Sequence, residues 1–191
     1  GAINSSTGTL TITGNLLGGS GSSQANGAGN ILTGTLNVSG NVTGGTLGEG
    51  VRNSAGGTIN ITGIVTGGSV ITAYGINNVL TGTINVAGTI IGGSTEAGAM
   101  NSSTGTIIVT RAVGNGYGPG SSGLAAAVGV ANSALGVVQI EQLEYGTLGM
   151  SPTSGAGFRL KKLTSNVAIF NYADTVGSKT LADATQGQMP A

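Results

Sequence analysis

The chain has 191 residues, with 39 Gly and no net charge, because six basic and six acidic side chains make up only 6% of the residues. It contains no His, Cys or Trp, which excludes disulfides, thiolate or His-based catalysis and the usual zinc ligands, and its neutral composition offers nucleic acid no electrostatic attraction. We therefore expect no enzymatic activity, cofactor, metal or nucleic-acid partner, and no membrane span, since no run of about 18 or more apolar residues occurs.

The first elements expected along the chain are coil corners, each marked by an Asn that stands four residues before a Gly. Five such pairs recur at steps of 26, 23, 25 and 23 residues, and periods of about 20–50 residues indicate solenoids or arrays. Asn tolerates left-handed backbone, and its amide can hydrogen-bond to the amide of the next coil. We predict an inward structural ladder, with a weaker match at Asn132, that consists of Asn4, Asn30, Asn53, Asn78 and Asn101.

A strand is predicted after each Asn–Gly pair. Polar and apolar residues alternate over 9–13, 35–39, 58–62 and 83–87, which is the period of a half-buried strand. A Gly then breaks each strand at a corner, at Gly14, Gly40, Gly63 and Gly88. The side chains predicted to point inward are Leu10, Ile12, Leu36, Val38, Ile59, Ile61, Ile84 and Val86. We predict an all-β fold in which residues 1–110 form a parallel β-solenoid, or β-helix, of 23–26 residues per coil.

A second, longer period lies over the first. The two residues after the repeat Asn alternate between small polar pairs such as Ser5-Ser6 and aliphatic pairs such as Ile31-Leu32, so that the larger repeat spans 48–49 residues. Either alternate coils face different neighbours, or two units close into one pair of a β-sandwich-like array. Both interpretations remain open on the sequence.

The residues after 110 depart from the repeat and contribute a divergent, β-rich C-terminal part. We expect a Gly-rich connector at 111–123 and a capping or assembly segment at 124–191. Residues 124–131 suit a short helix or a buried strand, and strands are predicted at 137–145, 158–163 and 167–173.

Few side chains in the chain suit catalysis. Glu49 and Glu96 fall in loops after corresponding turns two units apart, and we expect solvated loop charges rather than the paired carboxylates of a glycosidase. Glu141 and Glu144, with basic residues at 159–162, are expected on a solvent face or an interface rather than in a polysaccharide-lyase site. Outward Thr and Asn residues on the strands reflect β-propensity, with an ice- or crystal-matching face as the alternative.

The phrase Gly-Thr-Leu-Thr-Ile-Thr-Gly at residues 8–14, repeated with Gly-Gly-Ser turns, resembles the passenger repeats of autotransporters and of haemagglutinin-like adhesins. It is also similar to repeats in fibre-type surface proteins. The resemblance covers residues 3–110 and implies export, a β-solenoid, and adhesion or surface assembly. It assigns no functional residue to this chain.

We expect a structural extracellular protein that acts through self-association, as a subunit of a surface fibre, filament or layer, or as an adhesin stalk. Low charge leaves little repulsion between molecules, and an open strand edge invites another copy. The expected partners are copies of the chain, with glycans or a cell surface beside them. One alternative is a carbohydrate-binding module or polysaccharide-active β-helix, for which two Phe, four Tyr and no Trp leave few rings. Another is a phage tail fibre segment.

Overall fold

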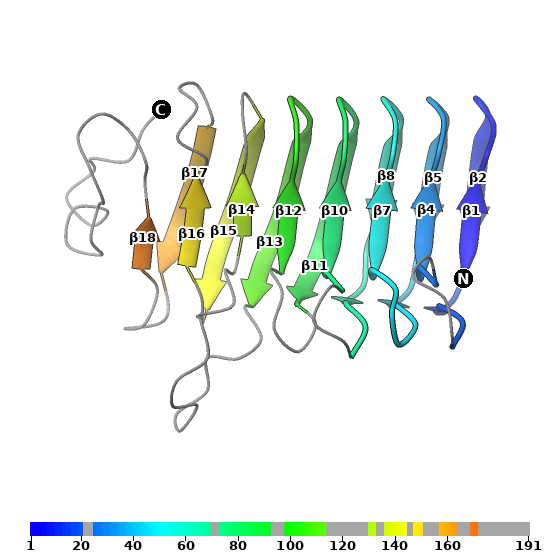
Figure 1. Ribbon diagram of the computed structural model, residues 1–191, viewed down its shortest axis with the longest axis horizontal. Coiled ribbons are helices and arrows are strands. Elements are labelled where there is room, and N and C mark those ends of the chain that lie inside the picture. The colour runs from blue at the N-terminus through cyan, green and yellow to red at the C-terminus, as the bar shows by residue number, and fades with distance from the viewer. Residues whose placement is uncertain are drawn as a thin grey trace.

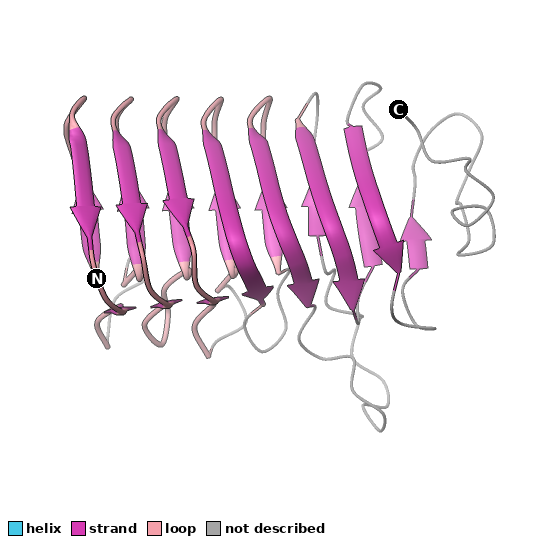
Figure 2. Ribbon diagram, turned by 180° about the vertical axis from the view of Figure 1, so that it is seen from behind, coloured by secondary structure: helices cyan, strands magenta, loops and turns pink. Residues whose placement is uncertain are grey.

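The computed structural model describes residues 1–20, 25–69, 73–92, 98–113, 130–132, 136–144, 147–150, 157–163 and 169–171. These residues form strands and turns with no helix, so none of them belongs to a helix able to cross a membrane. The strands stack in parallel as a β-solenoid, seen from its two sides in Figures 1 and 2. The predicted all-β, parallel β-solenoid is therefore confirmed.

Two parallel sheets form the walls of the solenoid. The eight-stranded sheet contains β1 (Ala2–Asn4), β4 (Ala28–Asn30), β7 (Val51–Asn53), β10 (Ile76–Asn78), β12 (Ala99–Asn101), β14 (Val130–Asn132), β16 (Thr147–Met150) and β18 (Ile169–Asn171). The ten-stranded sheet contains β2 (Thr9–Ile12), β5 (Thr35–Val38), β8 (Thr58–Ile61), β11 (Thr83–Ile91), β13 (Thr106–Val113), β15 (Val137–Glu144) and β17 (Gly157–Leu163), together with the short strands β3 (Leu16–Leu17), β6 (Val42–Thr43) and β9 (Val65–Thr66).

Each repeat unit forms one coil, which adds one strand to the eight-stranded sheet and either two shorter strands or one long strand to the ten-stranded sheet. The register is direct, since Thr35 pairs with Thr9 on one side and with Thr58 on the other. The alternative of a β-sandwich-like array is therefore wrong, because unequal units still stack one above the next. The longer period is instead expressed in the turns between the two sheets, at the upper edge of Figure 1.

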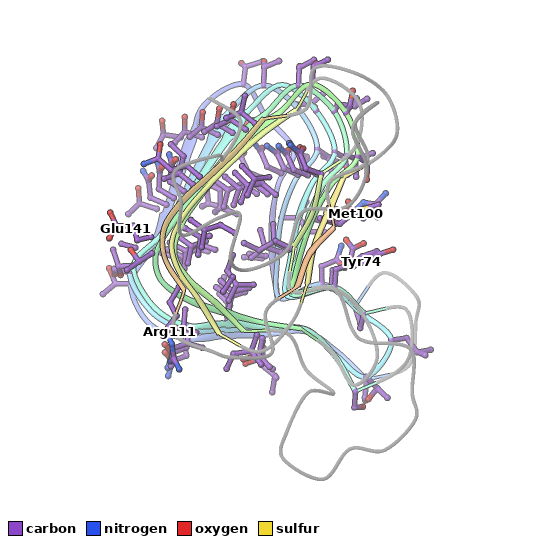
Figure 3. All side chains as sticks on the ribbon, turned by 90° about the vertical axis from the view of Figure 1, so that its left-hand side faces the viewer. Tyr74, Met100, Arg111 and Glu141 are labelled. Carbon is purple, nitrogen blue, oxygen red and sulfur yellow. The ribbon has the colours of Figure 1, made fainter. Side chains whose placement is uncertain are left out.

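The core lies between the two sheets and follows the predicted alternation. One continuous rank of buried aliphatic side chains runs through the ten-stranded sheet, formed by Leu36, Ile59, Ile84, Ile107 and Val138. Figure 3 looks along the stack and shows such ranks superimposed inside the coil. Each fully buried aliphatic side chain contributes about 1.5–3 kcal/mol, and the alternation repeats that contribution in every coil.

The predicted break at the corner glycine occurs in three coils and not in the fourth. Gly14, Gly40 and Gly63 lie in the gaps that separate β2, β5 and β8 from the short strands that follow them. Gly88 instead lies inside β11, which continues around the corner. The register between β11 and β13 shifts between Val86 and Thr89, so a bulge absorbs the bend that the other coils make with an interruption.

The strands of the C-terminal part continue both sheets. β13 runs through residues 106–113 and so crosses the expected limit of the repeat region at residue 110. β15 and β17 extend the ten-stranded sheet, while β14, β16 and β18 extend the other. Of the residues expected as a short helix or a buried strand, 130 and 131 lie in β14, and most of the expected connector lies outside the described residues.

Candidate functional site

The repeat asparagines occupy one buried column in the eight-stranded sheet. Each ends a short strand, and Asn53 pairs in register with Asn30 on one side and with Asn78 on the other. The same register continues from Asn101 to the end of β14. The buried column consists of Asn4, Asn30, Asn53, Asn78, Asn101 and Asn132.

Each of these side chains first bonds to its own turn. The Nδ2 atom of Asn53 donates to the carbonyl oxygen of Gly57 at 2.8 Å, and that of Asn101 donates to Gly105 at 2.7 Å. Side chain to side chain bonds from one coil to the next are formed by Asn78, which donates to Oδ1 of Asn101 at 3.2 Å, and by Asn101, which donates to Oδ1 of Asn132 at 2.9 Å, while Asn4 donates to the backbone oxygen of Thr35 in the next coil at 3.0 Å. Buried Oδ1 atoms that accept no hydrogen bond within the described part of the chain belong to Asn30, Asn53 and Asn78.

The Asn column also explains why a Gly stands four residues further on. A Cβ atom added to Gly82 would collide with Nδ2 of Asn53 and with the carbonyl oxygens of Ala55 and Gly57. The same collision with the asparagine of the preceding coil would occur at Gly57 and Gly105. The Asn of one coil and the Gly of the next are therefore a single packing unit, and this column holds the coils together.

A second column of amides lies on the outer face of the ten-stranded sheet, where the sequence indicated only outward polar residues. Nδ2 of Asn60 donates to Oδ1 of Asn37 at 2.8 Å, and Nδ2 of Asn85 donates to Oδ1 of Asn60 at 2.8 Å. Their recurrence at one position of the repeat unit was the signal that could have identified them. The bonds join three successive coils at the surface.

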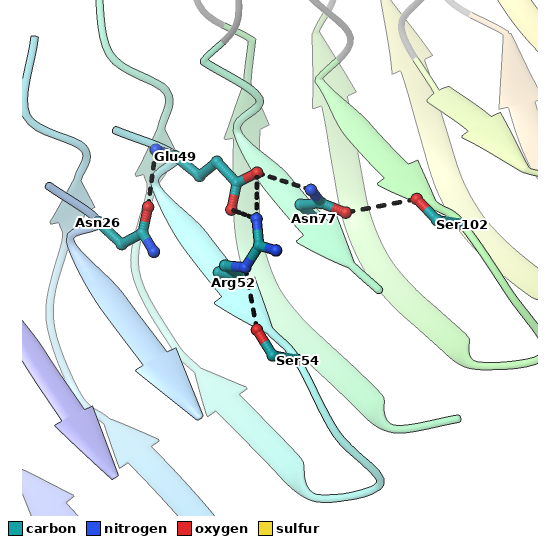
Figure 4. A network of polar contacts seen from close by, with 6 residues as sticks. All are labelled: Asn26, Glu49, Arg52, Ser54, Asn77 and Ser102. Carbon is teal, nitrogen blue, oxygen red and sulfur yellow. Dashed lines mark hydrogen bonds and ion pairs between the residues drawn. The ribbon is translucent and has the colours of Figure 1, made fainter. Parts of the chain in front are cut away.

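Two charged residues of the repeat coils, Glu49 and Arg52, lie together on the outer face of the eight-stranded sheet. Arg52, at the centre of β7, donates from Nη1 to the two carboxylate oxygens of Glu49 at 3.2 and 3.3 Å. Asn77, in the next coil, donates from Nδ2 to Oε1 of Glu49 at 2.6 Å. Figure 4 shows these residues in a polar row that also includes Asn26, Ser54 and Ser102.

The expectation that Glu49 is a solvated loop charge is wrong. Glu49 is only 8% exposed, because it lies against the sheet beside Asn77. Loss of water around the carboxylate raises the pKa of Glu49 above its ordinary value of 4.5, although the hydrogen bonds from Asn77 and Arg52 and the positive charge of Arg52 act in the opposite direction.

Of the other predicted acidic side chains, the structure describes only that of Glu141, which lies outside this site. Glu96 lies outside the described residues. Glu141 lies on the exposed face of β15, in the other sheet, and the side chain of Glu144 is likewise not described. The basic residues at 159–162 are described only as part of β17.

A groove of about 510 Å³ runs along the Gly-Gly turns of successive coils. Its described walls are glycine backbone, hydroxyl side chains such as Thr43 and Thr66, and Leu17 at one end. None of these lining residues carries a charge, so the groove lacks the groups that acid–base chemistry needs. The Glu49 network is therefore the more informative surface feature.

These observations establish a β-solenoid with a buried Asn column and, on its outside, the Glu49 network. Comparison of the chain with protein-family models, curated proteins and solved structures finds no match.

Proposed function

We propose that this chain is a structural extracellular protein, a subunit of a surface fibre, filament or layer or the stalk of an adhesin, that acts by associating with copies of itself. The resemblance to surface-protein repeats supports the extracellular location. The β-solenoid supports a scaffolding role, because a stack of coils displays the same surface positions again and again along its axis.

The observation that carries the proposal is a row of exposed aliphatic side chains on alternate coils. In the turns after the Asn column, Ile31 is 47% exposed, Leu32 is 45% exposed and Leu80 is 47% exposed. The coil between them carries Ser54-Ala55 at the same place, and the coil after Leu80 carries Ser102-Ser103. Backbone hydrogen bonds align these positions, such as Ser54 N to Asn30 O at 2.9 Å and Val79 N to Asn53 O at 2.8 Å.

This alternating row favours a second copy of the chain as its partner. Exposed apolar groups that repeat along one line mark an interaction surface, and their separation of two coils is about 10 Å. Another copy of the chain has the same spacing, so its aliphatic pairs can lie over the small serine and alanine positions of the first. The absence of net charge leaves no long-range repulsion to oppose the approach.

The test replaces the row with the residue that the alternate coils already use. The variant Ile31→Ser, Leu32→Ser, Leu80→Ser should keep the circular dichroism spectrum of the native chain and lose assembly in sedimentation velocity and negative-stain images. A control variant removes three exposed aliphatic side chains elsewhere, with Leu17→Ser, Leu47→Ser and Ile64→Ser, which are 68%, 38% and 43% exposed, and should assemble as the native chain does.

Two outcomes would contradict the proposal. Native chains that stay dispersed as monomers at every concentration reached would refute self-association. A folded serine variant that assembles like the native chain would refute the role of the row. A discrete trimer in place of open assemblies would instead favour a trimeric fibre segment of the kind found in phage tails.

A further inference from the structure

The Glu49 network occupies two adjacent columns on the outer face of the eight-stranded sheet. Asn26, Glu49 and Tyr74 hold one position in successive coils, since Gly27 N donates to Glu49 O at 3.1 Å and Gly50 N donates to Tyr74 O at 3.0 Å. Arg52 and Asn77 hold the neighbouring column, which continues to Met100 of β12. Figure 3 shows Tyr74 and Met100 on this outer face.

The β-solenoid itself does not require charges at these positions. The coil before Glu49 has Asn26 in its place and the coil after it has Tyr74, while Gly29 and Met100 stand where Arg52 stands. All of these residues form regular coils. Burial of a carboxylate carries a desolvation cost that a pair with Arg52 returns only in part, and such a local departure from the repeat is characteristic of a functional site.

The network holds its polar groups in fixed orientations. Arg52 donates from Nε to Oγ of Ser54 at 2.9 Å and from Nη1 to Glu49, and its side chain is 39% exposed. Asn77 is held by Glu49, and its Oδ1 lies 3.5 Å from Oγ of Ser102. A ligand would therefore meet, in the 39% exposed Arg52, a guanidinium that needs little further ordering.

We propose that this surface, formed by Glu49, Arg52, Tyr74 and Asn77, is a binding site for a neutral glycan. The carboxylate of Glu49 balances the guanidinium of Arg52, which favours an uncharged ligand over an anion. The planar Arg52 guanidinium matches a pair of adjacent sugar hydroxyls, while Asn77, which is only 8% exposed and is bonded to Glu49 and Ser102, holds the carboxylate in place. Tyr74, in the adjacent column, is the aromatic side chain that would pack against the apolar side of a sugar. The polar row from Asn26 to Ser102 crosses four coils, about 14 Å, so the glycan would lie along the solenoid axis.

The experiment uses the full chain labelled with ¹⁵N and three uncharged probes, cellohexaose, maltohexaose and mannohexaose. An oligogalacturonate serves as the anionic comparison. The chain has three Arg residues, so the Nε–Hε signal of Arg52 is readily assigned. At least one neutral probe should shift this signal and the Asn77 side-chain amide, and the oligogalacturonate should bind more weakly.

The matched variant gives the site the residues of neighbouring coils, Glu49→Asn and Arg52→Met, and should remain folded while affinity falls by about tenfold or more. A second variant, Tyr74→Leu, should weaken binding without removing the pair. The control variant Asn60→Thr also introduces a residue that another coil carries at the same position, but on the ten-stranded sheet. Thr11, Asn37 and Asn60 are in register there, and this variant should bind the glycan normally.

Three results would overturn the proposal. The first is that the Arg52 and Asn77 signals do not shift with any neutral probe at about 10 mM, a concentration above the millimolar dissociation constant of a weak site. The second is that the anionic oligomer binds more tightly than the neutral probes. The third is that the folded Glu49→Asn, Arg52→Met variant binds as well as the native chain. Self-association rests on the aliphatic row, so none of these results bears on it.

Discussion

Asn53 and Asn101 allow the contribution of the buried amide column to be measured with one substitution at two positions. Both side chains are fully buried and end equivalent strands of the eight-stranded sheet. They differ in their hydrogen bonds. Asn53 donates to Gly57, and its Oδ1 atom has no partner among the described residues. Asn101 donates to Gly105, to Asn132 and, at 3.5 Å, to the carbonyl oxygen of Val137, and it accepts from Asn78.

The expected cost of replacement by Ala follows from these bonds. Asn53→Ala removes one hydrogen bond, and the carbonyl oxygen of Gly57 keeps a second donor, the amide of Thr83 at 3.0 Å. The loss should therefore be about 1 kcal/mol of unfolding free energy. Asn101→Ala removes the bonds to Gly105, Asn132 and Val137 and the bond from Asn78, and should cost about 2–3 kcal/mol.

Urea unfolding followed by circular dichroism measures both variants, and hydrogen exchange of the amides in β8 and β13 locates the loss, since stacked coils need not unfold in one step. Asn101→Ala should show the lower unfolding midpoint. If Asn53→Ala proved equally or more destabilising, the number of hydrogen bonds would not set the cost, and our account of the column would be refuted.

Two further predictions concern the Asn–Gly contact and the buried carboxylate. Gly82→Ala should destabilise the chain by about 1–3 kcal/mol or prevent folding, while Gly8→Ala, whose Cβ would meet only Ser6 Oγ at 3.5 Å, should be mild; equal urea midpoints for the two variants would contradict the packing argument. Because the pKa of Glu49 is raised in the folded chain, the folded chain binds this proton more tightly than the unfolded chain does. The resulting stabilisation is complete below pH 4.5, the ordinary pKa, and is lost as the pH rises through the raised pKa of the folded chain. Between about pH 4 and pH 7 the native chain should therefore lose more stability than Glu49→Gln, as unfolding midpoints at the two pH values would show, and identical losses would argue against a raised pKa.

The sequence was sufficient to predict the coils but not the Glu49 network. The inward positions of Ile59 and Ile61 followed from period-two alternation, which depends only on residues within one strand. Asn77, by contrast, lies next to Asn78 in the sequence and carried no signal of its own. Its contact with Glu49 joins residues 28 positions apart, and that distance becomes a contact only once the coil register is known.

The bulge at Gly88 and strand β16 were missed for related reasons. The same Gly interrupts a strand in three coils, and the different outcome in β11 depends on the neighbouring β13, where the corresponding corner is one residue shorter between Val109 and Arg111. β16 has the sequence Thr-Leu-Gly-Met, which is too short and too weakly alternating to indicate a strand without its neighbours.

The contact between the Asn of one coil and the Gly of the next has a consequence for how such a chain can change in length. Each contact joins only two adjacent coils, so every coil carries both an Asn for the next coil and a Gly for the Asn of the preceding coil. Removal of residues 54–78 would join Asn53 to Val79 and leave Asn30 facing Gly82 as it now faces Gly57. Genetic gain or loss of whole units thus preserves every Asn–Gly contact, whereas an insertion of a few residues between the Asn and the Gly of a coil disrupts one.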